Sequence, residues 1–356
     1  MKHDKMKPME RVMTALAFNE PDRVPFFLLL TMHGARALNM SIREYFSRPE
    51  YVIAGQLRLR QRYGHDCFYP FFYAPIEVEA WGGEVIFPEN GPPNSGRPMI
   101  DRPEKIARLV PPNVSEPACL EKVLATIRGL KTASRGEVPI IGVAISPFSL
   151  PVMQMGFEGY MTLIYERPDL FWKLMAVNQA FCVQWANAQL AAGATAICYF
   201  DPLSSPTIIE RPTALKTGFT IARKTLAQIK GPTVIHLASG RALPVVDDLA
   251  ATGTSGVGVS VAEDLGEIKA ACHGKLGIIG NLNGIEMRRW RPDEAAFKVR
   301  EAISKAGPGG GFILADNHGE IPFQVPEQVL FSISETVYSQ GRYPLDRALM
   351  HQAKTA

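Results

Sequence analysis

Cysteine pairs and cysteine motifs are missing from this sequence. Its 356 residues include five cysteines, an odd number, which are scattered without any Cys-x-x-Cys spacing. Small disulfide scaffolds carry even numbers of cysteines at regular intervals, and cysteine-rich zinc fingers need cysteine pairs. The cysteine pattern excludes both classes and predicts a reduced, cytoplasmic chain.

Long apolar runs are also missing. The longest, Val24 to Met32, has the length of a strand, whereas a transmembrane helix needs roughly 18 or more apolar residues. The N-terminal segment MKHDKMKPMERV is charged and has no apolar core of the kind found in signal peptides. We therefore expect neither a membrane span nor secretion.

A strong excess of one charge is the third absence. The chain has 38 basic and 35 acidic residues, a formal net charge of +3. A nucleic-acid-binding protein usually shows a basic face, so we expect no nucleic-acid partner. A hydrophobic fraction of 46% and a charged fraction of 21% are typical of a folded enzyme.

Short apolar segments alternate with helix-length segments along the chain. Strands that are apolar throughout are typical of a parallel sheet buried on both faces. Eight strand–helix units predict an α/β fold, a single (β/α)8 TIM barrel. A doubly wound sheet is the alternative, but the first turn, Leu30–Gly34, lacks its Gly-x-Gly-x-x-Gly pattern. The strand candidates are Arg23–Leu30, Asp66–Phe72, Val138–Ser146, Thr195–Asp201, Thr233–Ala238, Gly256–Ser260, Leu276–Asn281 and Phe312–His318.

The domain organisation follows from this pattern. We expect an N-terminal helical extension over residues 1–22, with its helix near Pro8–Phe18 outside the barrel, then the barrel over 23–345 and a tail over 346–356. The Gly-, Pro- and Asn-rich segment Glu84–Pro112 is predicted to be an excursion, because the strand–helix alternation resumes after it. One long helix is predicted over Ser41–Tyr63, with Ser41 as its N-cap.

Polar residues end several of the predicted strands. In a (β/α)8 barrel the chemistry lies at the C-terminal ends of the strands. Asp201, His236 and His318 end the fourth, fifth and eighth strands. Two imidazoles and a carboxylate can supply three ligands of an open zinc site. The alternative is structural, since such an aspartate often caps a helix and such a histidine is often a hydrogen-bonded core residue.

Other candidates lie close to strand ends. Glu77, after the second strand, is a potential base or ligand, or simply an acidic residue in a helix first turn. His33 follows the first strand, and Asn281 ends the seventh. Dense aromatic and sulfur-bearing side chains predict an apolar pocket for a flat ligand, although half of them are expected to be core. The members proposed to line it are Phe72, Tyr73, Phe148 and Met153.

The chain resembles the uroporphyrinogen decarboxylase superfamily, specifically its cobalamin-dependent methyltransferases. The matching stretches occur in family order and cover nearly the whole chain, and the family fold is a (β/α)8 barrel. These stretches are Met9–Val12, Pro21–Pro25, Glu77–Gly83, Ser146–Phe148, Asp201–Pro206, His236–Gly240, Ile279–Asn281 and Gly311–Pro322.

The resemblance also argues against decarboxylation. The decarboxylases carry an arginine-rich stretch after the first strand, which holds substrate carboxylates, and an essential aspartate after the second. The matching positions here are Thr31–Ala35 and Tyr73. A tetrapyrrole that carries many carboxylates would therefore find no arginines after the first strand to bind them.

The methyltransferases of this family bind zinc through a His-x-Cys pair after the fifth strand and a cysteine after the eighth. His236 matches the histidine, Ala238 stands at the first cysteine, and His318 or Asn317 stands at the second. Either zinc is kept by Asp201, His236 and His318, or zinc is lost and the two histidines transfer protons. Zinc without thiolate ligands would be a stronger Lewis acid, suited to polarising a methyl ether.

The resemblance thus implies a cobalamin-dependent methyltransferase of the O-demethylase type. It would move a methyl group between a small methoxylated, aromatic compound and the cobalamin of a separate corrinoid protein, because the barrel leaves no room for a cobalamin domain. Zinc would act as Lewis acid, with Asp201, His236, His318 and Glu77 as catalytic residues. The alternatives are a metal-free decarboxylase or lyase and a non-catalytic, ligand-binding barrel. Direction of transfer and oligomeric state remain open.

Overall fold

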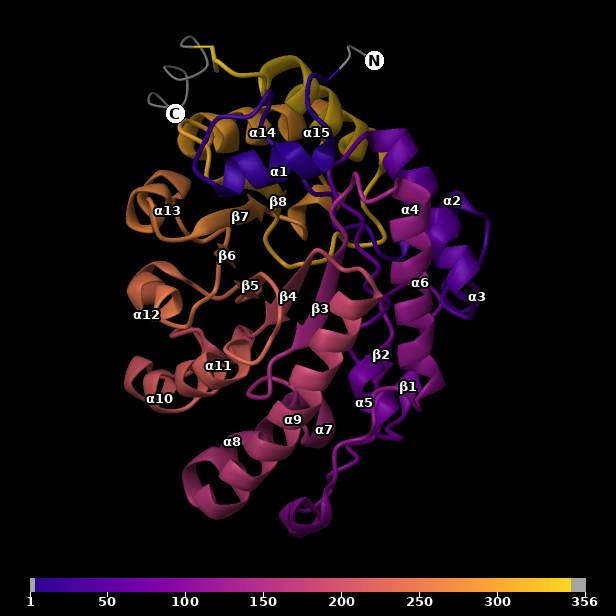
Figure 1. The fold of residues 1–356 in the computed structure, drawn as a ribbon, viewed down its shortest axis with the longest axis vertical. Coiled ribbons are helices and arrows are strands. Elements are labelled where there is room, and N and C mark those ends of the chain that lie inside the picture. The colour runs from indigo at the N-terminus through magenta and orange to yellow at the C-terminus, as the bar shows by residue number, and fades with distance from the viewer. Residues whose placement is uncertain (1–3, 347–356) are drawn as a thin grey trace.

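Six parallel strands form the centre of the molecule. In the computed structural model, which describes residues 4–346, they pair in chain order (Figure 1). Each corresponds to one of the predicted strands. Their bounds are β3 Ile141–Ile145, β4 Ala196–Phe200, β5 Thr233–His236, β6 Gly256–Gly258, β7 Gly277–Leu282 and β8 Phe312–Asp316. The predicted tail falls almost wholly outside the described residues, since only residue 346 of it is described.

The first two predicted strands close the ring without forming regular strands. Phe26 pairs with Leu314 of β8, and Phe68 pairs with Ile140 next to β3, both in parallel. The amide of Asp66 donates to the carbonyl of Phe26 at 2.8 Å, which joins the two segments to each other. Pro25 interrupts the first segment because proline has no amide hydrogen for a strand ladder. The architecture is therefore the predicted TIM barrel.

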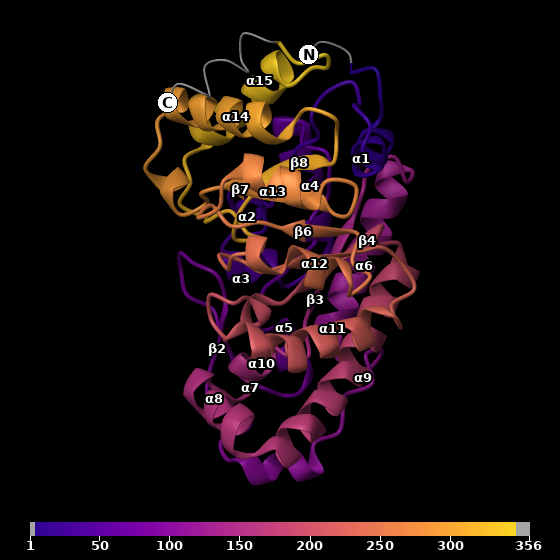
Figure 2. The ribbon, with the colours of Figure 1, turned by 90° about the vertical axis from the view of Figure 1, so that its left-hand side faces the viewer.

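Helices surround the ring of strands (Figures 1 and 2). The predicted helix over Ser41–Tyr63 is two helices, because the residue before Pro49 is held in an extended conformation. The helix bounds are α1 Pro8–Leu16, α2 His33–Ala37, α3 Ile42–Tyr45, α4 Pro49–Tyr63, α5 Ile76–Ala80, α6 Ala118–Ser134, α7 Pro151–Met155, α8 Phe157–Glu166, α9 Pro168–Ala192, α10 Arg211–Lys216, α11 Gly218–Leu226, α12 Val246–Ala250, α13 Leu265–Cys272, α14 Pro292–Ala306 and α15 Glu327–Gln340. None of these is long and apolar enough to cross a membrane.

The excursion after α5 contains a short antiparallel hairpin. Its strands are β1 Val85–Ile86 and β2 Asn94–Ser95, and a 3-10 helix, Pro103–Arg108, follows. This agrees with the predicted interruption of the barrel pattern by Glu84–Pro112.

Helix α1, Pro8–Leu16, lies across the N-terminal end of the barrel. The amide of Gly311, before β8, donates to the carbonyl of Ala15 at 2.6 Å, and the amide of Met9 donates to Glu137, before β3. The helix predicted near Pro8–Phe18 is thus present outside the strands. It closes the end of the barrel opposite to the strand ends at which the candidate site was expected.

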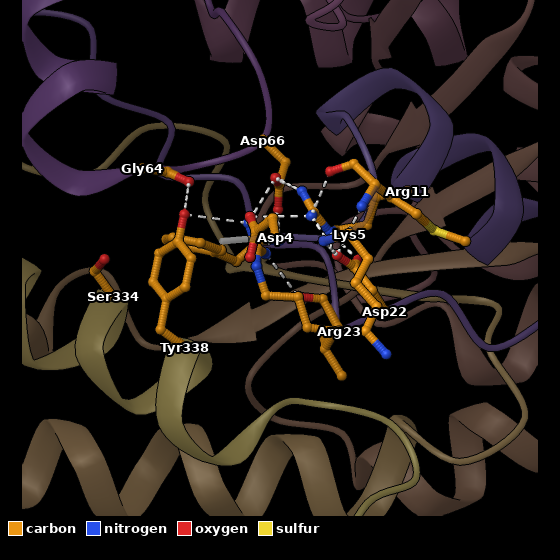
Figure 3. Close-up of polar contacts among 12 residues, drawn as sticks. Asp4, Lys5, Arg11, Asp22, Arg23, Gly64, Asp66, Ser334 and Tyr338 are labelled. Carbon is orange, nitrogen blue, oxygen red and sulfur yellow. Dashed lines mark hydrogen bonds and ion pairs between the residues drawn. The ribbon is translucent and has the colours of Figure 1, made fainter. Parts of the chain in front are cut away.

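A buried ionic network holds this N-terminal segment in place (Figure 3). Asp66 accepts one 2.7 Å hydrogen bond from Arg11 and another from Arg23, and all three side chains are fully buried. Arg11 also pairs with Asp22 at 2.6 Å. Buried charges require such pairing, so the network fixes α1 on the barrel.

Candidate active site

Asp201 follows β4, and its carboxylate accepts hydrogen bonds from serine hydroxyls. Its Oδ1 accepts hydrogen bonds from Ser146 at 2.6 Å and Ser149 at 2.8 Å, and its Oδ2 accepts one from Ser204 at 2.5 Å. Burial raises the pKa of Asp201 above its ordinary value, although these hydrogen bonds oppose the shift. The carboxylate therefore ties together the loops after β3 and β4.

His236 ends β5 and is buried, with 2% of its surface exposed. Its ring stacks on Phe200 at a centroid distance of 5.3 Å. Its Nδ1 accepts a 3.0 Å hydrogen bond from the amide of Ala238, so the neutral ring carries its proton on Nε2. Nε2 has no hydrogen-bond partner in the described chain. Burial, and secondarily His318, lower the pKa of His236 to about 4, which keeps the ring neutral at pH 7.

Glycine at position 258 makes room for this ring. A Cβ atom on Gly258 of β6 would lie 2.4 Å from Cδ2 of His236, much closer than packed carbon atoms allow. The sequence of β6, Gly-Val-Gly, is thus part of what positions the imidazole.

The end of β8 and the loop that follows it add two acids, Asp316 and Glu320, which the sequence alone did not single out. Oδ2 of Asp316 accepts from the amides of His318 and Gly319 at 2.8 and 2.9 Å. Burial raises the pKa of Asp316 to about 6 and that of Glu320 to about 7. Glu320 also accepts a hydrogen bond from the Thr31 hydroxyl. The sequence does place this segment at a strand end, but within it only His318 was chosen as a candidate, because it stands near a metal-ligand position of the family.

The predicted zinc ligands do not form a ligand set. Across residues 4–346, no three His, Cys, Asp or Glu side chains are arranged to hold a metal ion. Asp201 is occupied by serines. A metal-bound histidine donates its second ring N–H to an acceptor, whereas Nδ1 of His236 faces the amide of Ala238, a donor. His236 and His318 are neighbours, but the donors of Asp201, His236 and His318, as they are arranged here, do not suit zinc.

Three further candidates occupy separate positions. Glu77, on α5, accepts a 2.8 Å hydrogen bond from the amide of Ile145, and burial raises its pKa to about 8. His33 is buried edge-on to Phe323, and burial lowers its pKa to about 3. Asn281 donates to the backbone carbonyls of residues 260 and 263. Glu77 and His33 are buried polar groups near strand ends, and Asn281 has a clear structural role.

The expected aromatic pocket is packed as core. Tyr73 donates to Glu79 at 2.6 Å and contacts Phe72 edge-on, and both are buried. Phe148 is fully buried beside Tyr160 and the α9 helix. Met153 is partly buried against the same hydrophobic core. Phe72, Tyr73 and Phe148 are thus packed with other core side chains, and their role in substrate binding stays a prediction.

Comparison with known proteins places these features in a family. The model of the uroporphyrinogen decarboxylase (URO-D) family matches residues 7–339. The uroporphyrinogen decarboxylase of Azoarcus sp. (strain BH72) is 27% identical over 293 residues, which span 79% of this chain and 80% of that protein. The enzyme of the same name from Nitrosomonas europaea is 24% identical over 325 residues, covering 87% and 89% of the two chains.

Solved structures support the fold. A methyltransferase from Methanosarcina mazei superimposes with a TM-score of 0.79 at 19% identity, covering 94% of this chain and 99% of that one. A B12-independent methionine synthase from Shewanella sp. W3-18-1 gives a TM-score of 0.52 at 12% identity, with coverage of 90% and 95%.

Proposed function

Since the chain belongs to the uroporphyrinogen decarboxylase family, we propose that it is a family member which transfers methyl groups instead of decarboxylating a tetrapyrrole. Its substrates would be a small methoxylated aromatic compound and the cobalamin of a separate corrinoid protein. The structural neighbour from Methanosarcina mazei, a methyltransferase, supports this choice.

The charges buried at the strand ends favour a neutral substrate. Within the described chain, Arg11 and Arg23 are the only buried arginines and no lysine is buried. Both arginines are paired with Asp66 next to α1. Binding several carboxylates requires cations that form paired hydrogen bonds. The buried ionisable groups at the strand ends, such as Asp316 and His236, are instead acids or imidazoles.

The single observation that carries the proposal is the unpartnered Nε2 of a neutral His236. During demethylation the methyl–oxygen bond breaks, and the oxygen keeps the electron pair and takes up a proton. The reduced corrinoid supplies the nucleophile that receives the methyl group. A preorganised N–H donor stabilises the charge that develops on the oxygen. Glu320, with its pKa near 7, can hold and release the proton that the oxygen needs.

Product analysis tests this proposal against decarboxylation. The chain would be incubated with a reduced corrinoid protein and a panel of methoxylated aromatics, and separately with uroporphyrinogen. We expect the demethylated phenol from the first reaction and no carbon dioxide from the second. Carbon dioxide release without phenol formation would show a decarboxylase and contradict the proposal.

A further inference from the structure

The interior of the barrel is not filled by side chains. A cavity of about 320 Å³, here called the barrel chamber, lies between α1 and the inner face of the strands, whereas TIM barrels usually pack layers of branched side chains there. Strand β4 presents the small side chains of Ala196 and Cys198 to this space. Cys198 and Ile279 belong to central strands, yet each keeps 7% of its surface exposed. The ring of strands therefore encloses open space.

The barrel chamber opens at the end of the barrel opposite to the candidate active site. Its inner end is formed by Tyr69 and His236, each with 2% of its surface exposed. The wall residues that are exposed lie instead on α1 and before β5 and β6, and these are Met13, Ala17, Pro232 and Ser255. A ligand can therefore enter beside α1 without passing the strand ends.

The barrel chamber is deep and narrow. Along β5 its wall extends from Pro232 to His236, which corresponds to about 13 Å at the rise of a β-strand. A volume of about 320 Å³ spread over this depth leaves a narrow space. An apolar cavity of about 150 Å³ stays dry and binds benzene, and ligand pockets start at about 300 Å³. The dimensions thus suit a linear molecule better than a compact one.

The walls of the barrel chamber offer no charge to a ligand. Within residues 4–346, no lysine, arginine, aspartate or glutamate lines it. Arg11 of α1 is held by Asp22 and Asp66 instead (Figure 3). A charged ligand group would lose its hydration without gaining a partner, which is costly. The hydroxyls of Thr195 and Ser255, near the mouth, can form hydrogen bonds with an uncharged polar group.

We propose that the barrel chamber binds an uncharged linear molecule, an unbranched alkyl chain that ends in a hydroxyl or another neutral polar group. The chain lies along the strands, and its polar end stays at the mouth beside Thr195 and Ser255. Val12 and Leu16 of α1 form part of the wall, so the bound chain also stabilises the position of this helix. The ligand is not the substrate of the proposed reaction, and the inference does not depend on that reaction.

Titration of the full chain with octan-1-ol, followed by NMR of the isoleucine methyl groups, tests the site. The signals of wall isoleucines should shift and saturate, whereas those of exposed isoleucines outside the chamber should not. The wall set is Ile141, Ile279 and Ile313, and the exposed set is Ile86, Ile208 and Ile285. Octanoate has the same length but a charge, so it should bind roughly tenfold or more weakly. Adamantan-1-ol, a compact alcohol, should also bind more weakly than octan-1-ol.

Two substitutions that fill the chamber locate the binding within it. Ala196→Leu and Val234→Phe add carbon atoms to its wall, and each should lower the affinity for octan-1-ol by roughly tenfold or more. Ala133→Leu is the matched control, because Ala133 is exposed on α6 and lies outside the chamber. Wall signals that do not shift in the wild-type chain would overturn the proposal. Unchanged affinity in both filled variants would do so too, as would octanoate or adamantan-1-ol binding as tightly as octan-1-ol.

Discussion

The amide of Ala238 donates a 3.0 Å hydrogen bond to Nδ1 of His236. This contact determines that the neutral ring presents a proton, and not a lone pair, at Nε2. Ala238 reaches this position with a φ of 51°, in the left-handed region that few side chains occupy. The backbone after β5 therefore makes His236 a hydrogen-bond donor.

A first prediction concerns zinc. Because Nε2 of His236 carries a proton and Asp201 is held by serines, protein purified without chelator should contain substoichiometric zinc, and chelators should not reduce activity. Elemental analysis measures the first point. One zinc per chain, lost together with activity in His236→Ala, would refute this description of the site.

A second prediction concerns Asp201. Asp201→Asn removes the charged acceptor for the hydroxyls of Ser146, Ser149 and Ser204 and should lower the free energy of unfolding by about 1–3 kcal/mol. Urea denaturation measures the change. Asp247→Asn is the control, because Asp247 is 84% exposed and pairs with Lys275 at the surface. Equal effects of the two substitutions would show that the serine contacts contribute nothing.

A third prediction concerns the room around His236. Gly258→Ala should displace the imidazole, because the new Cβ would lie 2.4 Å from the ring. Overpacking of this kind costs about 1–3 kcal/mol, and methyl transfer should fall more strongly than stability. At Gly159, on α8, a Cβ atom would meet its nearest neighbour at 3.8 Å, so Gly159→Ala should leave both unchanged. A fully active Gly258→Ala protein would be inconsistent with a fixed imidazole.

A fourth prediction concerns acid stability. Burial alone would raise the pKa of Asp22, but the hydrogen bonds from Arg11 and from the amides of Met6 and Lys5, together with the charge of Arg11, outweigh it, and the pKa lies below its ordinary value. A lowered pKa stabilises the folded state above the unfolded-state value, near 3.9, and this stabilisation is lost as pH falls through the folded value. Asp22→Asn should therefore flatten the pH dependence of unfolding below about pH 4. The exposed Glu137→Gln, which pairs with Lys7 at the surface, should have a smaller effect.

The fold followed from alternation of apolar strands with helix-length segments. Six predicted strands are regular, while the segments around Phe26 and Phe68 form only isolated bridges. Strand-like apolar patterning does not reveal where a proline removes a ladder hydrogen bond. Helical patterning likewise did not reveal the break before Pro49. Proline disfavours the helical conformation of the residue before it, so Pro49 itself indicated that break.

The site was less predictable because strand-end position does not determine side-chain direction. The sequence placed Asp201, His236 and His318 at the correct strand ends, but Asp201 turns toward the serines after β3 and β4. Asp316 and Glu320 lie within Gly311–Pro322, one of the segments that carry the family resemblance, and their position at a strand end could have identified them. The room for the His236 ring depends on Gly258 in β6, whose effect appears only when the strands are assembled.

Transfer of a labelled methyl group is the most direct measurement. A single-turnover reaction between a methoxy-¹³C aromatic ether and a reduced corrinoid protein would be run with the wild-type chain and with His236→Phe. We predict that the label moves to the corrinoid and an unlabelled phenol appears, at a rate at least about 100-fold lower in His236→Phe. No label on the corrinoid with any methoxylated aromatic ether, or equal rates for both proteins, would contradict a methyl transfer that depends on His236.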